Sequence, residues 1–395
     1  MKGTGLFDIT RTLMIISGAW RSGLPKVSKL LNVFYVGYSA VIQFSYFLYF
    51  LCYAVNFYFL YFEDFDKAIE NLSGNTFVLL LVAKVLLCQK NRLISTLKQA
   101  HREELDVYRE EDRSVREIYE HHLKYFYKLI FTIASYNGIV LLKLYIVGIG
   151  GSYQFRKIHR HDNVTLEKPL PLPLWYPFDH NRFHVVALTF QLVALVWSAL
   201  FNTMVYAVSN SLAIFLRGKI KIFQYRLRNF DRCNLYVNRD DSGSLLEVCL
   251  FKKLCREHQM LIRMTRCLNA SFRSLFLLEY SLTSLLMGAV LVQIHKGVDL
   301  FFYVTYFFLI FCQLLNICWN ANEIKYESLE LVPALYESNW CERSNQVKTM
   351  IKFMMLKCQR PLVLSVGPFG PLTMDDAVSR LKLAYSFLSI MSGRS

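Results

Sequence analysis

The sequence predicts an all-α membrane protein with seven transmembrane helices, a cytoplasmic N-terminus and an extracellular C-terminus. Hydrophobic residues make up 54% of the 395 residues, whereas soluble domains contain about 45–50%. Residues 30–62 carry no charged side chain, and residues 183–216 form a second uncharged run that only His184 interrupts. Because about 20 apolar residues cross a bilayer, each run is long enough to span a membrane.

Basic residues orient the predicted helices. The hydrophobic runs place the spans near residues 30–57, 66–88, 125–148, 184–216, 274–293, 300–320 and 372–391. With the N-terminus inside, the inner segments contain 32 Lys and Arg residues and the outer segments contain 8. Cytoplasmic segments of membrane proteins are enriched in these residues, so the excess supports this orientation.

The net charge of +15 lies mainly on the predicted cytoplasmic segments. That placement favours acidic lipid headgroups as partners and argues against nucleic acid. A G-protein-coupled receptor has an outside N-terminus, and this chain has no Asp/Glu-Arg-Tyr triplet at either end of its third span. The odd span count without an inverted repeat argues against a transporter. No nucleophile motif, phosphate-binding glycine loop or metal-ligand cluster indicates an enzyme, a metal or another cofactor.

Two Asn-x-Ser/Thr sequons lie on predicted outer segments, at Asn71 and Asn163. Glycosylation occurs on the extracellular side, so both are predicted glycosylation sites. A third sequon, at Asn269, falls on an inner segment and is expected to stay unmodified.

The predicted cytoplasmic segments have helical patterns of their own. Residues 89–124 balance eight basic against eight acidic side chains, many of them three or four apart, as in Glu110–Arg113 and Arg113–Glu117. This spacing predicts a solvated helical hairpin with weak ion pairs; a docking surface for a partner is the alternative. Apolar residues at helical spacing in residues 217–273 and 321–371 predict that spans continue as cytoplasmic helices, which form an anchor domain.

The outer loop before the fourth span is rich in proline and aromatic residues. Alternating prolines over residues 169–177 favour an extended course, and Trp175, Tyr176 and Phe178 lie among or just after them. Two uses fit: an aromatic belt at the membrane interface, or a lid over a cavity between helix ends.

Ionisable residues within predicted spans are candidates for function. Lys84 and Lys128 lie near inner helix ends, where Lys84 is expected to snorkel to the interface. For Lys143 and Glu279, pairing or snorkelling is the expected explanation.

The last predicted span differs from the others because it carries two acids and two bases in its first half. Each charge facing lipid at the membrane centre costs about 2.5–3.5 kcal/mol, a cost that a helix surrounded by protein and water avoids. The segment is therefore the candidate pore lining. Leu388, Met391 and Ser392 are spaced three and four apart and share one face.

Two stretches of the chain resemble the insect odorant receptors. One is the loop at residues 171–179, which reads PLPLWYPFD. The other is the C-terminal block, with LYESNW at 335–340, MMLKCQRPL at 354–362, GPLT at 370–373 and KLAYSF at 382–387. The topology expected from charge agrees with this resemblance.

The resemblance implies a subunit of a ligand-gated, non-selective cation channel that detects a small volatile ligand. Such receptors lie in the plasma membrane of olfactory sensory neuron dendrites and form a hetero-tetramer with the odorant receptor co-receptor. Residues 1–320 would form a six-helix ligand-binding region, and residues 321–395 a cytoplasmic anchor helix followed by the pore-lining helix. Gustatory-type receptors share the topology, but their final helix typically reads Thr-Tyr, aliphatics and Gln-Phe, which this chain lacks.

The same resemblance implies site residues. The co-receptor ends in Thr-Tyr, aliphatics and Gln, whereas residues 384–391 here read AYSFLSIM; the departure indicates an odorant-tuning subunit. By this match Leu388 and Met391 occupy hydrophobic gate and lumen positions, with Ser392 beside them. Odorant would bind in the outer half among spans two, three, four and six, which predicts the pocket residues Ile69, Leu72, Thr76, Phe77, Gly138, Leu142, Tyr145, Leu188, Thr189, Tyr303 and Tyr306.

Overall fold

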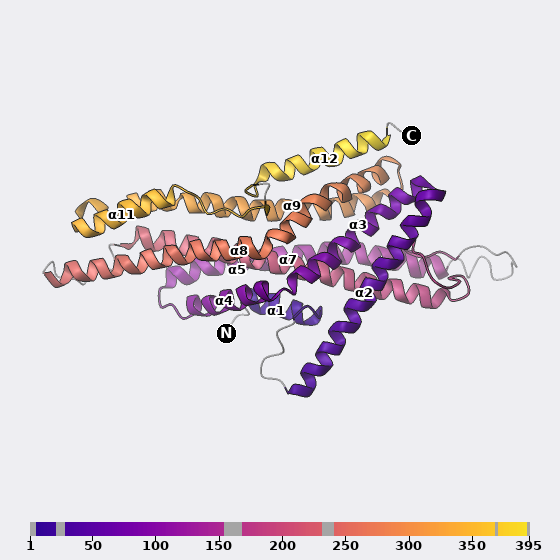
Figure 1. The fold of residues 1–395 in the computed structure, drawn as a ribbon, viewed down its shortest axis with the longest axis horizontal. Helices are drawn as coiled ribbons and strands as arrows, with labels where there is room; N and C mark the ends of the chain where they lie inside the picture. The colour runs from indigo at the N-terminus through magenta and orange to yellow at the C-terminus, as the bar shows by residue number, and fades with distance from the viewer. Residues whose placement is uncertain (1–4, 21–27, 154–167, 231–240, 368–369, 393–395) are drawn as a thin grey trace.

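The computed structural model describes residues 5–20, 28–153, 168–230, 241–367 and 370–392. These residues form an elongated bundle of helices (Figure 1). The helices that precede the last one are, in order, α1 (Leu6–Ile16), α2 (Lys29–Glu63), α3 (Phe65–Cys88), α4 (Asn91–Tyr108), α5 (Arg113–Tyr145) with the π-turn η1 (Ile146–Gly150), α7 (His184–Arg228), α8 (Asp241–His295), α9 (Leu300–Leu329), α10 (Leu331–Tyr336), the 3-10 turn η3 (Trp340–Glu342) and α11 (Asn345–Cys358).

Seven of the helices correspond to the predicted spans. Within the described part of the chain, α2, α3, α5, α7, α8 and α9 are long and apolar enough to cross a membrane. The seventh, α12 (Met374–Ser392), carries four charged residues in 19 and is more polar than those six. The predicted all-α architecture is confirmed. The expected cytoplasmic extensions are also helical, since α7 and α8 continue well past the predicted spans and α11 lies at one end of the bundle (Figure 1).

Helix α7 forms the centre of the bundle. Nearly every side chain from Phe201 to Leu216 is buried, and polar residues join this helix to its neighbours. Asn202 donates to the Asn137 side-chain oxygen of α5 at 3.0 Å, and Asn320 of α9 donates to that of Asn210 at 2.8 Å. Buried amides cost free energy unless they are hydrogen-bonded, so these contacts set the register between helices.

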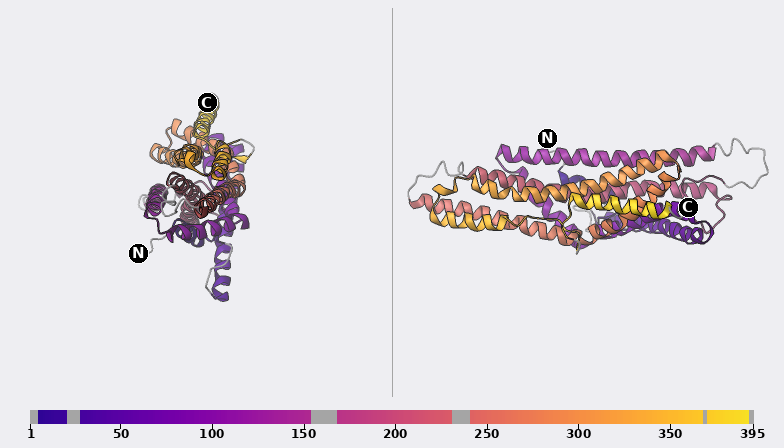
Figure 2. Two further views of the ribbon diagram at one scale, coloured as in Figure 1. Left: turned by 90° about the vertical axis from the view of Figure 1, so that its left-hand side faces the viewer. Right: turned by 90° about the horizontal axis from the view of Figure 1, so that it is seen from above.

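Helix α2 lies across one side of the bundle, and its first half stands clear of the other helices (Figure 2). Ser28 caps its start, where the hydroxyl accepts from the Leu31 amide at 3.4 Å. Val33, Phe34 and Val41 are each 69% exposed, which a helix surrounded by lipid tolerates because hydrocarbon tails solvate apolar side chains. The second half returns to the bundle, where Tyr46 packs edge-on against Phe201 with ring centroids 4.9 Å apart.

The predicted hairpin forms from α4 and the start of α5. The Arg113–Glu117 pair is confirmed at 2.8 Å, and the Asp112 carboxylate caps α5 by accepting from the Ser114 amide at 2.8 Å. The expected Glu110–Arg113 contact is wrong, because Glu110 instead pairs with Arg226 of α7. Glu110 therefore joins the hairpin of α4 and α5 to the central helix α7.

Candidate functional site

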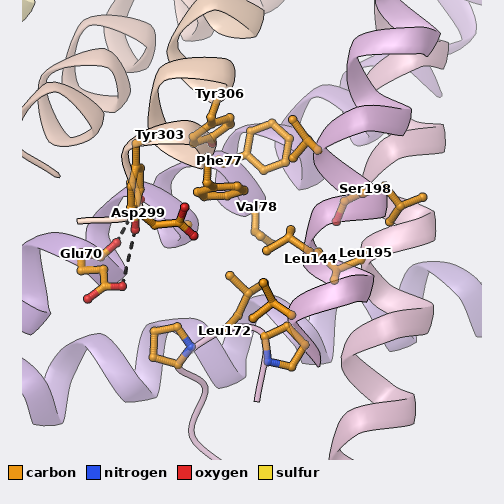
Figure 3. A pocket seen from close by; sticks show the side chains of 18 of the residues that line it. Glu70, Phe77, Val78, Leu144, Leu172, Leu195, Ser198, Asp299, Tyr303 and Tyr306 are labelled. Atoms are coloured by element: carbon orange, nitrogen blue, oxygen red, sulfur yellow. Dashed lines mark hydrogen bonds between the residues drawn. The ribbon is translucent and has the colours of Figure 1, made fainter. Parts of the chain in front are cut away.

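A cavity of about 180 Å³ lies among α2, α3, α5, α7 and α9, beside the turn that joins α8 to α9. Most of its wall is apolar or aromatic, as expected for a small-molecule site. Figure 3 shows side chains from several helices and from the proline-rich loop, such as Phe77, Leu172 and Tyr306, converging on it. The helix residues that line it are Tyr49, Tyr53, Glu70, Asn71, Ser73, Gly74, Phe77, Val78, Asn137, Val140, Leu141, Leu144, Leu195, Ser198, Ala199, Phe302, Tyr303, Tyr306 and Leu309.

Helix α3 supplies the polar part of the wall. Glu70, Gly74 and Phe77 follow one another at spacings of four and three, so they share a helix face. An added Cβ at Gly74 would lie 2.7 Å from the Tyr53 ring. The glycine is therefore what lets α2 approach α3 beside the cavity.

Helix α9 supplies aromatic rings. Tyr306 stacks on Phe302 and meets Phe77 edge-on, in each case with centroids 5.8 Å apart. Tyr303 is 6% exposed, and its hydroxyl donates to the Glu70 carboxylate at 3.5 Å. Figure 3 shows Tyr303 and Glu70 pointing toward one another at one end of the cavity.

The proline-rich loop closes one side of the cavity through Pro171, Leu172 and Pro173. Gln191 of α7 holds the loop, because its amide donates to the Leu172 carbonyl at 2.8 Å and accepts from the Leu172 amide at 3.2 Å. Burial raises the pKa of the Tyr176 hydroxyl, which accepts a further bond from Gln191 at 2.8 Å. The sequence left two uses open for this loop, a lid over a cavity or an aromatic belt. Residues 171–173 fit the first, because they line the cavity, while Trp175 and Phe178 are partly exposed at the surface.

Two oppositely charged side chains at the rim of the cavity pair with each other. Lys143 of α5 contacts the Asp299 carboxylate of the α8–α9 turn, and its ammonium lies 5.0 Å from the Phe302 ring centroid. The sequence left pairing or snorkelling open for Lys143, and pairing is confirmed.

The predicted pocket residues are only partly brought together. Phe77, Tyr303 and Tyr306 line the cavity. The other eight lie elsewhere: Ile69 and Thr76 are buried away from it, Leu72 and Leu188 are partly exposed, Gly138, Leu142 and Thr189 are exposed, and the Tyr145 hydroxyl donates to the Leu192 carbonyl.

On α3 and α5 the predicted and the observed lining residues differ by a rotation about the helix axis. The prediction for α5 was Gly138, Leu142 and Tyr145, whereas the lining residues are Asn137, Leu141 and Leu144. A shift of one residue turns a side chain by about 100° around an α-helix. The lining residues of α3 that were missed are Glu70, Asn71, Ser73, Gly74 and Val78. Glu70 carried a signal, because it is an ionisable residue inside a predicted span.

The two predicted glycosylation sites have different outcomes. Asn71 is 1% exposed, lines the cavity and donates from Nδ2 to the Pro173 carbonyl at 3.0 Å. A glycan on this nitrogen is incompatible with that packing, so the prediction for Asn71 is corrected. Asn163 lies outside the described residues.

Beyond the cavity, a buried ion pair joins α3 to α8. Lys84 is 1% exposed and contacts the Glu279 carboxylate, which also accepts from the Tyr206 hydroxyl at 2.7 Å. The Lys84 ammonium lies 5.1 Å from the Tyr206 ring centroid. Pairing of Glu279 is thus confirmed, whereas the expected snorkelling of Lys84 is wrong, because its partner lies inside the bundle.

Helix α12 packs along α8 and α9 (Figure 1). Arg380 donates to the Tyr280 carbonyl at 2.7 Å, and Phe387 lies so close to Gly288 that an added Cβ there would be 2.7 Å from its ring. Leu388 and Met391 are half-buried on the side of the helix that also carries Ala384. Ser392 ends the helix.

The model of the 7tm odorant receptor family matches residues 64–385, which include every helix around the cavity except α2, together with most of α12. This chain belongs to that family. Among curated relatives, Odorant receptor 10 of Aedes albopictus is 25% identical over 185 residues, which are 46% of this chain and 48% of that protein. Odorant receptor 82a of Drosophila melanogaster is 24% identical over 59% of this chain and 60% of that protein.

A solved structure has the same fold. The insect olfactory receptor OR5 from Machilis hrabei, in complex with eugenol, superposes with a TM-score of 0.76 and 16% sequence identity, covering 98% of each chain. The matches to the curated relatives span about half to three fifths of their length. Family and fold together identify a multi-pass membrane protein of a receptor family rather than an enzyme family.

Proposed function

We propose that this chain is the odorant-tuning subunit of a ligand-gated, non-selective cation channel. It would assemble with the odorant receptor co-receptor as a hetero-tetramer in the plasma membrane of olfactory sensory neuron dendrites. In this proposal residues 1–320 bind the volatile ligand, and residues 321–395 provide the cytoplasmic anchor helix and the pore-lining α12.

The observation that carries the proposal is the cavity inside the helical bundle of an odorant receptor family member. It is lined by aromatic and aliphatic side chains with few polar groups, which suits a small, largely apolar molecule. It also lies among α3, α5, α7 and α9, the elements expected to surround an odorant.

The packing provides a route from the cavity to the pore helix. Tyr303 and Tyr306 belong to α9, and α9 and α8 pack against α12. A ligand opens a channel only by binding the open state more tightly than the closed state. Ligand contacts with α9 therefore need to change the position of α8 and α9 relative to α12.

The first test is whole-cell current in a heterologous cell during a panel of volatile compounds, with and without the co-receptor. Evoked cation current only when both chains are present is the expected result. A chain that reaches the surface together with the co-receptor and responds to no volatile contradicts the proposal.

The gate is tested separately with Leu388→Ala. A ring of Leu-sized side chains closes a pore by excluding water, so the truncation is expected to raise the basal current several-fold without ligand. Ile390→Ala is the matched control, since Ile390 lies on α12 but is 60% exposed, away from Ala384. Equal basal currents in the two variants at equal surface level would reject the assignment of Leu388.

A further inference from the structure

The cavity contains a carboxylate that no cation neutralises within the described residues. Glu70 is half-buried on α3, and its side chain accepts one long hydrogen bond, from the Tyr303 hydroxyl at 3.5 Å. The other carboxylate of the wall, Asp299, is already paired with Lys143. The cavity therefore has one negative charge more than its neighbouring cations balance.

A second acceptor beside Glu70 also lacks a partner. Asn71 is 1% exposed and lines the cavity, and its Oδ1 is buried with no hydrogen-bond partner. The orientation of the amide is determined by Pro173, whose carbonyl can only accept and receives the bond from Nδ2. A buried acceptor without a donor costs about 1–3 kcal/mol, so the wall beside Glu70 is short of donors.

The amide and serine donors of the polar wall are already engaged by the protein. Ser73 donates to the Glu70 carbonyl, Asn137 to Thr203 and Ser198 to the Ala194 carbonyl. Together with the Asn71 Nδ2 bond to Pro173, these contacts occupy the amide and serine donors of the wall and leave the Glu70 carboxylate as an available acceptor. Tyrosine hydroxyls in the wall, such as that of Tyr306, can still donate, so it is the charge of Glu70 that favours a cationic donor.

The aromatic wall suits a positive charge next to an apolar body. Ring faces attract cations, and Phe302 already has the Lys143 ammonium 5.0 Å from its centroid. Phe77, Tyr306 and Phe302 form a continuous aromatic part of the cavity wall, because Tyr306 contacts both other rings. The volume of about 180 Å³ slightly exceeds the roughly 150 Å³ of an apolar cavity that holds benzene.

We infer that the ligand of this cavity is a small protonated amine with a benzene-sized body. Its ammonium group donates to the Glu70 carboxylate, and its ring lies against Phe77, Phe302 and Tyr306. The inference rests on the proposed odorant-receptor function and specifies the chemical class of the ligand.

The experiment compares 2-phenylethylamine with 2-phenylethanol on cells that express this chain and the co-receptor at neutral pH. The two probes share a ring and a chain and differ in the charged donor. In the unsubstituted receptor, the half-maximal concentration of the amine is expected to be at least tenfold lower than that of the alcohol. Glu70→Gln is expected to raise the value for the amine about tenfold to hundredfold, the effect of losing an ionic hydrogen bond, and to change that for the alcohol less than about twofold.

Glu63→Gln is the matched control, because it removes an exposed carboxylate at the end of α2 that does not line the cavity. It is expected to leave both responses unchanged. An equal shift for both probes in Glu70→Gln, or an alcohol that is as potent as the amine on the unsubstituted receptor, overturns the inference. The comparison of the amine with the alcohol on the unsubstituted receptor needs no variant. It therefore tests the inference even if Glu70→Gln does not reach the surface.

The two proposals fail in different ways. Current evoked by neutral volatiles but not by the amine overturns the ligand class and leaves the receptor function standing. No current with any volatile, despite surface expression with the co-receptor, overturns the receptor function and the ligand class together.

Discussion

Glu70 and Glu279 are carboxylates in the same helical bundle, but their surroundings differ. Glu279 is 5% exposed and contacts Lys84 and the Tyr206 hydroxyl. Among the residues that the structure describes, Glu70 contacts only the Tyr303 hydroxyl, at 3.5 Å, and it lies on a cavity. A buried charge is costly unless it is paired, so the protein satisfies Glu279 internally and leaves Glu70 free to meet another molecule. The pair at Glu279 is expected to support the fold, and Glu70 to support recognition.

The largest expected effect is on the paired carboxylate. Glu279→Ala leaves the Lys84 ammonium buried without its partner, and breaking one side of a buried pair costs about 3–5 kcal/mol. Surface labelling and thermal unfolding in detergent should both show a strong loss. The double variant Lys84→Met/Glu279→Met removes both charges and should recover much of that loss. Normal stability of Glu279→Ala would remove the distinction between the two carboxylates.

An intermediate effect is expected at the aromatic wall beside Glu70. Tyr303→Ala enlarges the cavity and removes the hydroxyl that donates to the carboxylate. Changes of this size in a pocket alter discrimination between ligands by about 10–100-fold, so the rank order of a volatile panel should change.

Tyr145→Ala is the control for this variant, because the same truncation on α5 lies outside the cavity. It should lower all responses together with the surface level, since the lost bond is to the Leu192 carbonyl. A changed rank order in Tyr145→Ala would instead place that residue at the ligand.

The smallest effect is expected for an exposed ion pair. Arg113 and Glu117 are 2.8 Å apart, and their side chains are 87% and 61% exposed. Arg113→Ala should change the free energy of unfolding by no more than about 0.5 kcal/mol, visible as an almost unchanged thermal unfolding midpoint. A large loss of stability in Arg113→Ala would show that this exposed ion pair contributes as much to the fold as the buried pair at Glu279.

The amino-acid sequence alone determined the architecture. Hydrophobic runs located six apolar helices, four charges marked α12 as different, and periodic apolar residues predicted that α7 and α8 extend beyond the membrane. These features depend on length and composition along the chain, which need no knowledge of neighbouring elements. Tyr303 and Tyr306 were found because the resemblance to odorant receptors implied a site in the outer half of the bundle, where α9 carries them.

The tertiary structure decided which residues face the cavity and which charges meet. Membrane helices are apolar on every side, because lipid and protein interior are both apolar, so α3 and α5 show no amphipathic pattern that defines an inner face. A rotation of one residue then separates Leu142 from Leu141 and Ile69 from Glu70. Likewise, only packing could bring Lys84 to Glu279 and leave Glu70 without a cation, since those partners lie on different helices far apart in the chain.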